Sequence, residues 1–143
     1  MKKIKYLTLL FLAVSVGFTS CKKDDDEVSI VGKWGTTKSV NINYTGTIKG
    51  STETETTFTA EDYIEFKSDG TTILSEDGDT DAGTYTFNND TQKLSIKFTG
   101  DDESVVFDIK TLTTTDLVLY TEEIDVEGST TYKYTSEVSF KRK

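Results

Sequence analysis

The sequence of 143 residues contains no histidine and no proline, and its only cysteine is Cys21. Without histidine, the chain lacks the commonest general base near neutral pH and the commonest protein ligand of transition metals. No serine–histidine or cysteine–histidine pair can form, and no glycine-rich phosphate loop joins a strand to a helix. We therefore expect a protein that is not an enzyme, with no catalytic residues and no cofactor.

The chain has no proline and 26 threonines, and both features favour β-strands. A β-branched side chain packs well on a pleated surface, and no proline interrupts a hydrogen-bonded ladder. A single cysteine excludes an internal disulfide, so the stability of the fold has to come from buried apolar area and backbone hydrogen bonds.

The first 20 residues have the pattern of a secretory signal peptide. Met1–Lys5 is basic, and Tyr6–Phe18 is an uncharged, mostly apolar run of 13 residues. This run is too short for a permanent membrane-spanning helix, which needs about 20 residues. We expect residues 1–20 to be removed.

Cys21 stands at the end of this leader, after Thr19 and Ser20. The sequence Thr-Ser-Cys resembles the lipobox of bacterial lipoproteins, with Phe18 where leucine is more usual. The resemblance implies cleavage before Cys21 and acylation of this residue. Two or three acyl chains hold a protein stably on a membrane, at about 0.8 kcal/mol per buried methylene. The alternative is a free cysteine after an ordinary signal peptide.

The residues after Cys21 are charged, and Lys23, Asp24, Asp25 and Asp26 resemble the export signal of Bacteroidota surface lipoproteins. This resemblance implies a place on the outer membrane, facing the exterior. Such charge runs are also typical of a solvated tether, and the two roles are compatible. We therefore assign residues 21–29 to a lipidated cysteine and an acidic tether.

The charge of the mature chain excludes several partners. The 25 acidic residues outnumber the 16 basic ones, and the loss of residues 1–20 removes three lysines and no acid, which leaves about −12. A field of this sign repels nucleic acid and anionic lipid headgroups. We expect no nucleic-acid partner, and contact with the membrane through the N-terminal lipid only.

Residues 30–143 read as one domain of eight to ten short strands without a helix. Apolar residues alternate with polar ones in segments such as Lys93–Phe98, and Asp69-Gly70 is typical of a tight turn between strands. Ser51–Ala60 is poor in large apolar residues, which predicts an edge strand or a hairpin that protrudes past the core. Sequential hairpins at this spacing favour a single antiparallel up-and-down β-barrel, with a β-sandwich as the alternative.

The order of short motifs in this domain resembles the lipocalin-like lipoprotein domains of the Bacteroidota. The motifs that carry the resemblance are Gly32-Lys33-Trp34, Phe66–Thr71, Gly83–Phe87, Leu94–Ile96 and Leu112–Leu119. The resemblance implies a lipocalin-like barrel in which Trp34 closes one end. It does not identify a ligand, because one fold serves many functions.

The loop Asp77–Asp81 carries three carboxylates at alternate positions, as calcium loops do. Ala82 replaces the glycine of such a loop, and Asn88 stands where a bidentate glutamate is needed. We therefore expect a solvated hairpin loop and no metal site.

The many aromatic residues predict either a filled barrel or a small pocket at its mouth, since about eight strands enclose just enough room for side chains or one small ligand. We favour a largely filled core, with Tyr44, Phe58 and Tyr132 at the pocket rim. The first functional hypothesis is a monomeric surface lipoprotein that binds a small apolar or amphipathic ligand. The alternative is a structural or interaction module that contacts another envelope protein or a glycan.

Overall fold

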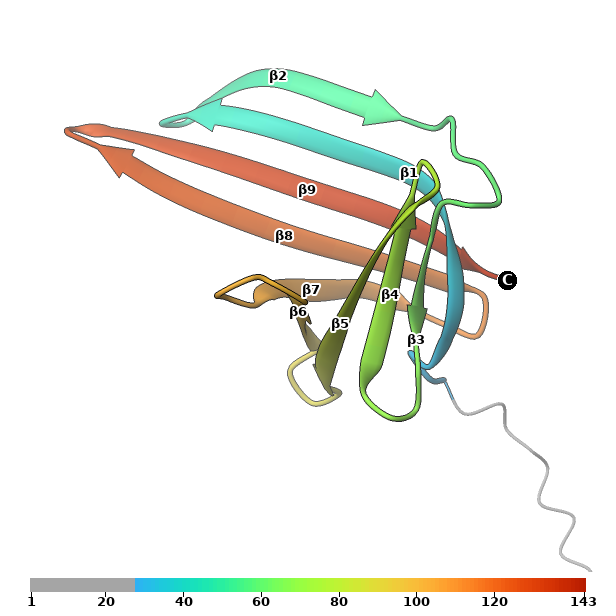
Figure 1. Ribbon diagram of the computed structural model, residues 1–143. Helices are drawn as coiled ribbons and strands as arrows, with labels where there is room; N and C mark the ends of the chain where they lie inside the picture. The colour runs from blue at the N-terminus through green and yellow to red at the C-terminus, as the bar shows by residue number, and fades with distance from the viewer. Residues whose placement is uncertain (1–27) are drawn as a thin grey trace, which may run out of the picture.

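The computed structural model describes residues 28–143, and these residues form nine antiparallel strands and no helix (Figure 1). The strands are β1 (Gly32–Thr45), β2 (Ile48–Glu55), β3 (Tyr63–Phe66), β4 (Thr71–Glu76), β5 (Asp79–Asn88), β6 (Lys93–Phe98), β7 (Val105–Leu112), β8 (Asp116–Glu127) and β9 (Thr130–Arg142). The all-β prediction and the strand count are confirmed. Within this described segment, nothing forms an apolar helix of membrane-spanning length.

Eight of the strands close into a barrel. β1 pairs with β3, the strands then follow one another in order to β9, and β9 pairs back with β1. β2 is an additional strand that pairs only with the distal part of β1. The barrel prediction is therefore confirmed over the sandwich alternative. Because the ladder closes within residues 32–142, this segment is a complete barrel by itself.

The barrel interior is filled at one end. The fully buried large side chains include Trp34, Phe66, Leu94, Ile96 and Leu117. The Phe66 and Tyr85 rings meet edge to face with their centroids 4.9 Å apart, an arrangement that aromatic pairs prefer. Apolar burial on this scale is the main source of stability in a chain without disulfides.

Trp34 closes the filled end, as the resemblance implied. Its side chain is 0% exposed, and its indole N–H donates a 2.8 Å hydrogen bond to the carbonyl oxygen of Ile30. The Arg142 guanidinium lies over the indole ring, 4.2 Å from the ring centroid. The chain segment before β1 therefore packs directly beneath the closed end.

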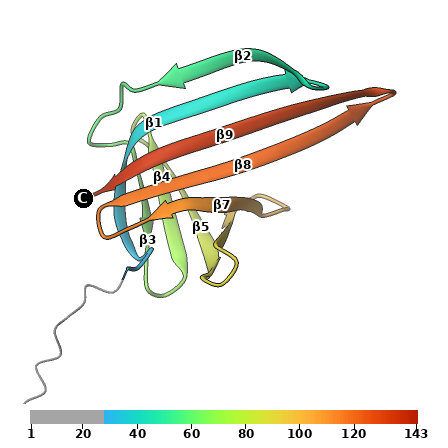
Figure 2. The same ribbon diagram turned by 180° about the vertical axis from the view of Figure 1, so that it is seen from behind.

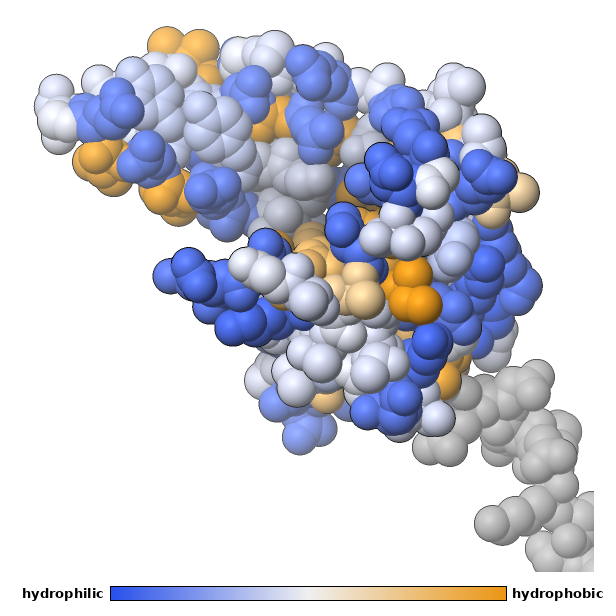
Figure 3. All heavy atoms as spheres, in the orientation of Figure 1, coloured by the Kyte–Doolittle hydropathy of each residue, from blue (hydrophilic) through white to orange (hydrophobic). Residues whose placement is uncertain are grey.

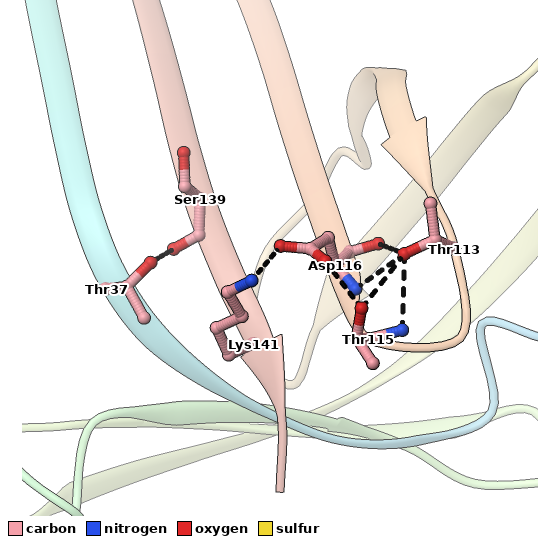
Figure 4. A network of polar contacts seen from close by, with 6 residues as sticks. All are labelled: Thr37, Thr113, Thr115, Asp116, Ser139 and Lys141. Carbon is pink, nitrogen blue, oxygen red and sulfur yellow. Dashed lines mark hydrogen bonds and ion pairs between the residues drawn. The ribbon is translucent and has the colours of Figure 1, made fainter.

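A polar network fixes the turn between β7 and β8 at the same end (Figure 4). The Thr113 hydroxyl oxygen accepts hydrogen bonds from the backbone N–H groups of Asp116 (2.8 Å) and Thr115 (3.2 Å). Lys141 forms an ion pair with the Asp116 carboxylate. The hydrogen bonds from Lys141 and the Thr115 hydroxyl lower the pKa of Asp116 from its ordinary value. This network joins the turn to β9.

Four strands continue past the open end as a sheet that we call the arm (Figures 1 and 2). The arm consists of β2, the Ser39–Thr45 part of β1, the Thr130–Ser136 part of β9 and the Thr121–Glu127 part of β8. Its inner face continues the inner wall of the barrel, and its outer face continues the outer wall.

A β-bulge at Thr37 decides which residues of β1 face inward in the arm. Thr36 pairs with Phe140 and Lys38 pairs with Ser139, so Thr37 is the extra residue. The Thr37 hydroxyl donates a 2.9 Å hydrogen bond to the Ser139 carbonyl oxygen (Figure 4). One extra residue moves every following side chain to the other face.

The predicted edge segment is half of a protruding hairpin, as expected from Ser51–Ala60. The turn at Gly46, with φ of +58°, leads into β2, and all eight residues of β2 are exposed. Residues 56–62 then return to the barrel wall at β3.

Candidate functional site

The open end of the barrel is the place where the inner wall stops being apolar. Beyond Val138, the inner face of β9 carries Ser136, Tyr134 and Tyr132. Because of the bulge, the neighbouring strand β1 presents Asn41 and Asn43 on this face. The inner wall therefore changes from a packed core to a polar surface with aromatic rings.

Two rows of side chains cross the inner face of the arm. In the first row, Tyr134 pairs with Glu123 of β8 on one side and with Asn43 of β1 on the other. In the second row, Ser136 pairs in the same way with Thr121 and Asn41. Directly opposed residues in an antiparallel sheet have Cβ atoms about 5 Å apart, so each row is continuous.

These rows form one wall of an open groove of about 560 Å³ at the barrel mouth. The start of β7 and the residue before it, Ser104–Val106, form the opposite wall. Figure 3 shows the notch between the arm and the lobe that β6 and β7 build. The Thr121 hydroxyl donates a 3.2 Å hydrogen bond to the Val106 carbonyl oxygen and joins the two walls. The full lining is Asn41, Asn43, Ser104, Val105, Val106, Thr121, Glu122, Glu123, Tyr134, Thr135 and Ser136.

The groove is acidic. Glu123 projects from the inner face, and among the described residues that line the groove neither lysine nor arginine is present. Glu122 lies 3.5 Å from the Lys133 ammonium on the outer face and accepts a 3.0 Å hydrogen bond from the Tyr120 hydroxyl. Burial and this carboxylate raise the pKa of Tyr120. The Glu122 carboxylate thus lies on the outer face, and Glu123 supplies the negative charge on the groove side.

A second hollow, of about 530 Å³, lies on the wall formed by β4, β5 and β6 around Gly83. Its lining includes Ile73, Ala82 and Lys97, which alternate with inward residues and so belong to the outer wall. This hollow is a depression in the outside of the barrel around Gly83. The mouth groove is the better candidate site because it opens from the barrel interior.

The structure does not bring the three predicted rim residues together. Tyr132 pairs with Thr45 and lies on the inner face, whereas Tyr44 pairs with Lys133 and lies on the outer face of the arm. Phe58 is half-buried in the loop before β3. None of the three is among the residues that line the groove.

Tyr44 has a different environment from the one expected for a rim residue. The Lys133 ammonium lies 4.5 Å from the centroid of its ring on the outer face. A regular alternation from Trp34 would turn Tyr44 inward, and the bulge at Thr37 turns it outward.

The predicted lipid attachment residue, Cys21, lies outside the described residues. The same holds for the predicted export residues Lys23, Asp24, Asp25 and Asp26. The first described residues, Val28–Val31, enter beneath the closed end, where the Arg142 side chain donates hydrogen bonds to the carbonyl oxygens of Ser29 (2.5 Å) and Val31 (3.0 Å).

The acidic segment Asp77–Asp81 forms a tight hairpin turn and the start of β5. Asp77 and Gly78 have φ of +53° and +89°, and Asp79 pairs with Glu76. Within residues 28–143, no group of three histidine, cysteine or acidic side chains is placed to hold a metal ion. The three carboxylates are therefore divided between a turn and a strand.

The residues predicted for the site did not include Asn41, Asn43, Glu123 or Ser136. The two asparagines alternate with apolar residues along β1, and a regular alternation from Trp34 would place them on the outer face. Only the position of the bulge shows that they face the groove.

Comparison with known proteins gives one finding. A family model described as a lipocalin-like domain matches residues 30–119, which is more than half of the chain. No curated protein and no solved structure matches the chain significantly.

Proposed function

Because the chain belongs to the lipocalin-like domain family, we propose that it is a surface-exposed outer-membrane lipoprotein whose barrel binds a small amphipathic ligand and catalyses no reaction. The observation that carries the proposal is the groove of about 560 Å³ at the open end of a barrel that is otherwise filled. Its volume falls in the range of about 300–1,000 Å³ that is usual for ligand sites.

The lining supports an amphipathic ligand over a purely apolar one. Val105, Val106 and the Tyr134 ring offer apolar contact, and most of the other lining side chains are amides, hydroxyls or carboxylates. A hydrocarbon in this groove would cover polar groups without pairing them, at about 1–3 kcal/mol for each unsatisfied group. The Glu123 carboxylate disfavours anionic ligands, so we propose a neutral or cationic one.

The first test of binding uses a soluble mature chain that starts at Lys22, because residues 32–142 close the barrel by themselves. Native mass spectrometry should show a co-purifying small molecule. Calorimetric titration should then show saturable binding that Asn41→Trp weakens at least tenfold by filling the groove. The control variant is Asn89→Trp, at an exposed asparagine in the β5–β6 turn near the closed end. Equal binding by both variants would place the ligand elsewhere and refute the proposed site.

The anchor is proposed at Cys21. Residues 28–31 lie beneath the closed end, so an anchor that precedes them would hold the mouth and the arm away from the membrane. Cys21→Ala should release the protein from membranes and abolish labelling with a fatty-acid analogue. Continued membrane association or continued labelling of this variant would remove the anchor from the proposal.

The export signal is proposed at Lys23–Asp26. Replacement of residues 23–27 by alanine should make the protein inaccessible to external protease on intact cells while its lipid labelling persists. If protease still cleaves the variant from intact cells, these residues act only as a tether.

A second candidate function, an interaction module for another envelope protein, is favoured by one observation. Among the described residues, β2 pairs only with β1, and the Glu122–Glu127 part of β8 pairs only with β9. Free strand edges can take up an extended segment of a partner. Cross-linking on intact cells through a photoreactive residue at Thr54 of β2 would capture such a partner, and the carrier function predicts no protein adduct there.

A further inference from the structure

The inner face of the arm carries an aromatic ring, Tyr134, that is left exposed toward the groove. Tyr134 is 48% exposed, although it lies on β9 between two paired strands. Strand pairing on both sides fixes the face from which the Tyr134 side chain projects, so the ring stands on the inner face of the arm. The face of an aromatic ring carries partial negative charge and attracts C–H groups, whose hydrogens are weakly positive.

Hydrogen-bonding groups surround this ring on the same face. Asn43 and Glu123 oppose Tyr134 directly, and Asn41 and Ser136 occupy the adjacent row. Amides and hydroxyls donate and accept, whereas a carboxylate only accepts. A ligand that satisfies this set needs several groups that act as both donor and acceptor, placed around an apolar face.

From this arrangement we propose that the mouth groove binds a neutral sugar, with Tyr134 as the platform for one pyranose ring. A pyranose has a face of C–H groups that can stack on the tyrosine and a rim of hydroxyls that can pair with Asn43 and Glu123. The proposal rests on the proposed function, because it names the ligand class of the same groove. An alkyl chain would satisfy the ring but would leave the surrounding polar groups unpaired.

The negative charge of the groove favours neutral sugars over acidic ones. Glu123 has no ion-pair partner among the described residues, and its carboxylate lies beside the ring. An acidic sugar would bring a second negative charge next to it, which is unfavourable in a partly enclosed site. Neutral sugars should therefore bind more tightly than uronic acids.

The face can accommodate more than one sugar unit. Tyr132 lies two residues from Tyr134 on the same face, opposite Asp125 and Thr45. Alternate residues of a strand are about 6.8 Å apart, so the two rings form a short row along the arm. An oligosaccharide that lies along this row should bind more tightly than its monosaccharide.

The experiment titrates the mature chain that starts at Lys22 with three probes by calorimetry. The probes are a panel of neutral hexose trisaccharides, uronic acid trisaccharides, and a single-chain alkyl ammonium surfactant below its critical micelle concentration. We expect at least one neutral trisaccharide to bind more tightly than any uronic acid probe. Surfactant binding without sugar binding would refute the sugar inference and leave the proposed function standing, whereas binding of no probe would contradict both.

Variants test whether the sugar uses the ring. Tyr134→Ala should weaken binding of the neutral trisaccharide about tenfold, and Tyr134→Phe should retain most of it because the stacking face remains. Tyr44→Ala, on the opposite face of the same sheet, is the matched control and should leave binding unchanged. Glu123→Gln should improve binding of the uronic acid probe relative to the neutral one. Sugar binding that is insensitive to Tyr134→Ala would overturn the proposed platform.

Discussion

The Arg142 guanidinium packs on the Trp34 indole, 4.2 Å from the ring centroid, and so joins the last strand to the first at the closed end. The same side chain donates hydrogen bonds to three backbone carbonyl oxygens, those of Ser29, Val31 and Thr114. One residue thereby holds the entering chain, the β7–β8 turn and the plug of the barrel.

We expect Arg142→Leu to destabilise the fold by about 2 kcal/mol, because hydrogen bonds from a charged donor contribute about 1.5–3 kcal/mol. Arg142→Lys should recover only part of this loss, since an ammonium lacks the planar fork and stacks less well. Urea unfolding followed by the emission of Trp34, the only tryptophan, measures both variants. Equal stability of the lysine variant and the wild type would show that charge alone holds this end together.

Gly83 allows β5 to approach β6 closely. A Cβ atom at this position would lie 2.5 Å from the Lys97 carbonyl oxygen and 3.0 Å from the Phe98 Cα. Both are backbone atoms of a paired strand, so the ladder has to shift to make room.

We therefore expect Gly83→Ala to cost about 1–3 kcal/mol of stability, as overpacking does in a close-packed interior. Ala82→Ser, at the exposed neighbouring position, is the control and should change stability by less than about 0.5 kcal/mol. Chemical denaturation of the two variants and the wild type measures the difference in the free energy of unfolding. A Gly83→Ala variant as stable as the wild type would mean that the β5–β6 pairing tolerates a Cβ atom at this position.

Local signals made much of the fold predictable from the sequence. Asp69-Gly70 predicted a turn, and Gly70 has φ of +84°, which glycine adopts readily. The alternation in Lys93–Phe98 predicted one inward face, and Leu94 and Ile96 are buried there. The residues that make up each pattern are close together in the sequence, so each pattern can be recognised without knowledge of the neighbouring strands.

The site was much less predictable, because it depends on a bulge and on pairing between distant strands. Thr37 is one threonine among many, and nothing in its local sequence marks it as the extra residue of β1. If Thr37 instead took a regular place in the ladder, Val40, Ile42 and Tyr44 would face the groove, and Asn41 and Asn43 would face outward. The Glu123–Tyr134–Asn43 row joins three strands whose register only the closed ladder defines.

Asp62 fixes the loop that leads into β3 and should make it sensitive to acid. One carboxylate oxygen accepts hydrogen bonds from the backbone N–H (2.5 Å) and the hydroxyl (2.9 Å) of Thr59, and the other accepts a 2.9 Å bond from the backbone N–H of Asp77. These hydrogen bonds lower the pKa of Asp62 from its ordinary value of 3.8. A lowered pKa in the folded state stabilises the fold above the unfolded value and loses this effect as the pH falls through the folded value.

Asp62→Asn should therefore lower the melting temperature at pH 7, and its difference from the wild type should shrink below about pH 3.8. The amide has one acceptor oxygen where the carboxylate uses two. Asp90→Asn, at an exposed position in the β5–β6 turn, is the control. Thermal unfolding across this pH range tests the linkage, and a constant difference between Asp62→Asn and the wild type would contradict it.

The free edge of β8 carries acidic side chains that should keep copies of the protein apart. In the described part of the chain, β7 pairs with β8 only as far as Tyr120. The stretch beyond it pairs with β9 alone and includes Glu123, Asp125 and Glu127, together with the exposed Ile124 and Val126. Charges on an open edge prevent edge-to-edge association, which apolar side chains would otherwise favour.

Replacement of these three acids by their amides should produce concentration-dependent self-association through β8. The matched control removes the same number of charges at Asp101, Asp102 and Glu103, in the exposed β6–β7 loop. Sedimentation velocity over a range of concentrations should show dimers for the edge variant and monomers for the control. Equal association of the two variants would attribute the effect to net charge, and a monomeric edge variant would show that the twist of the arm protects the edge without help from charge.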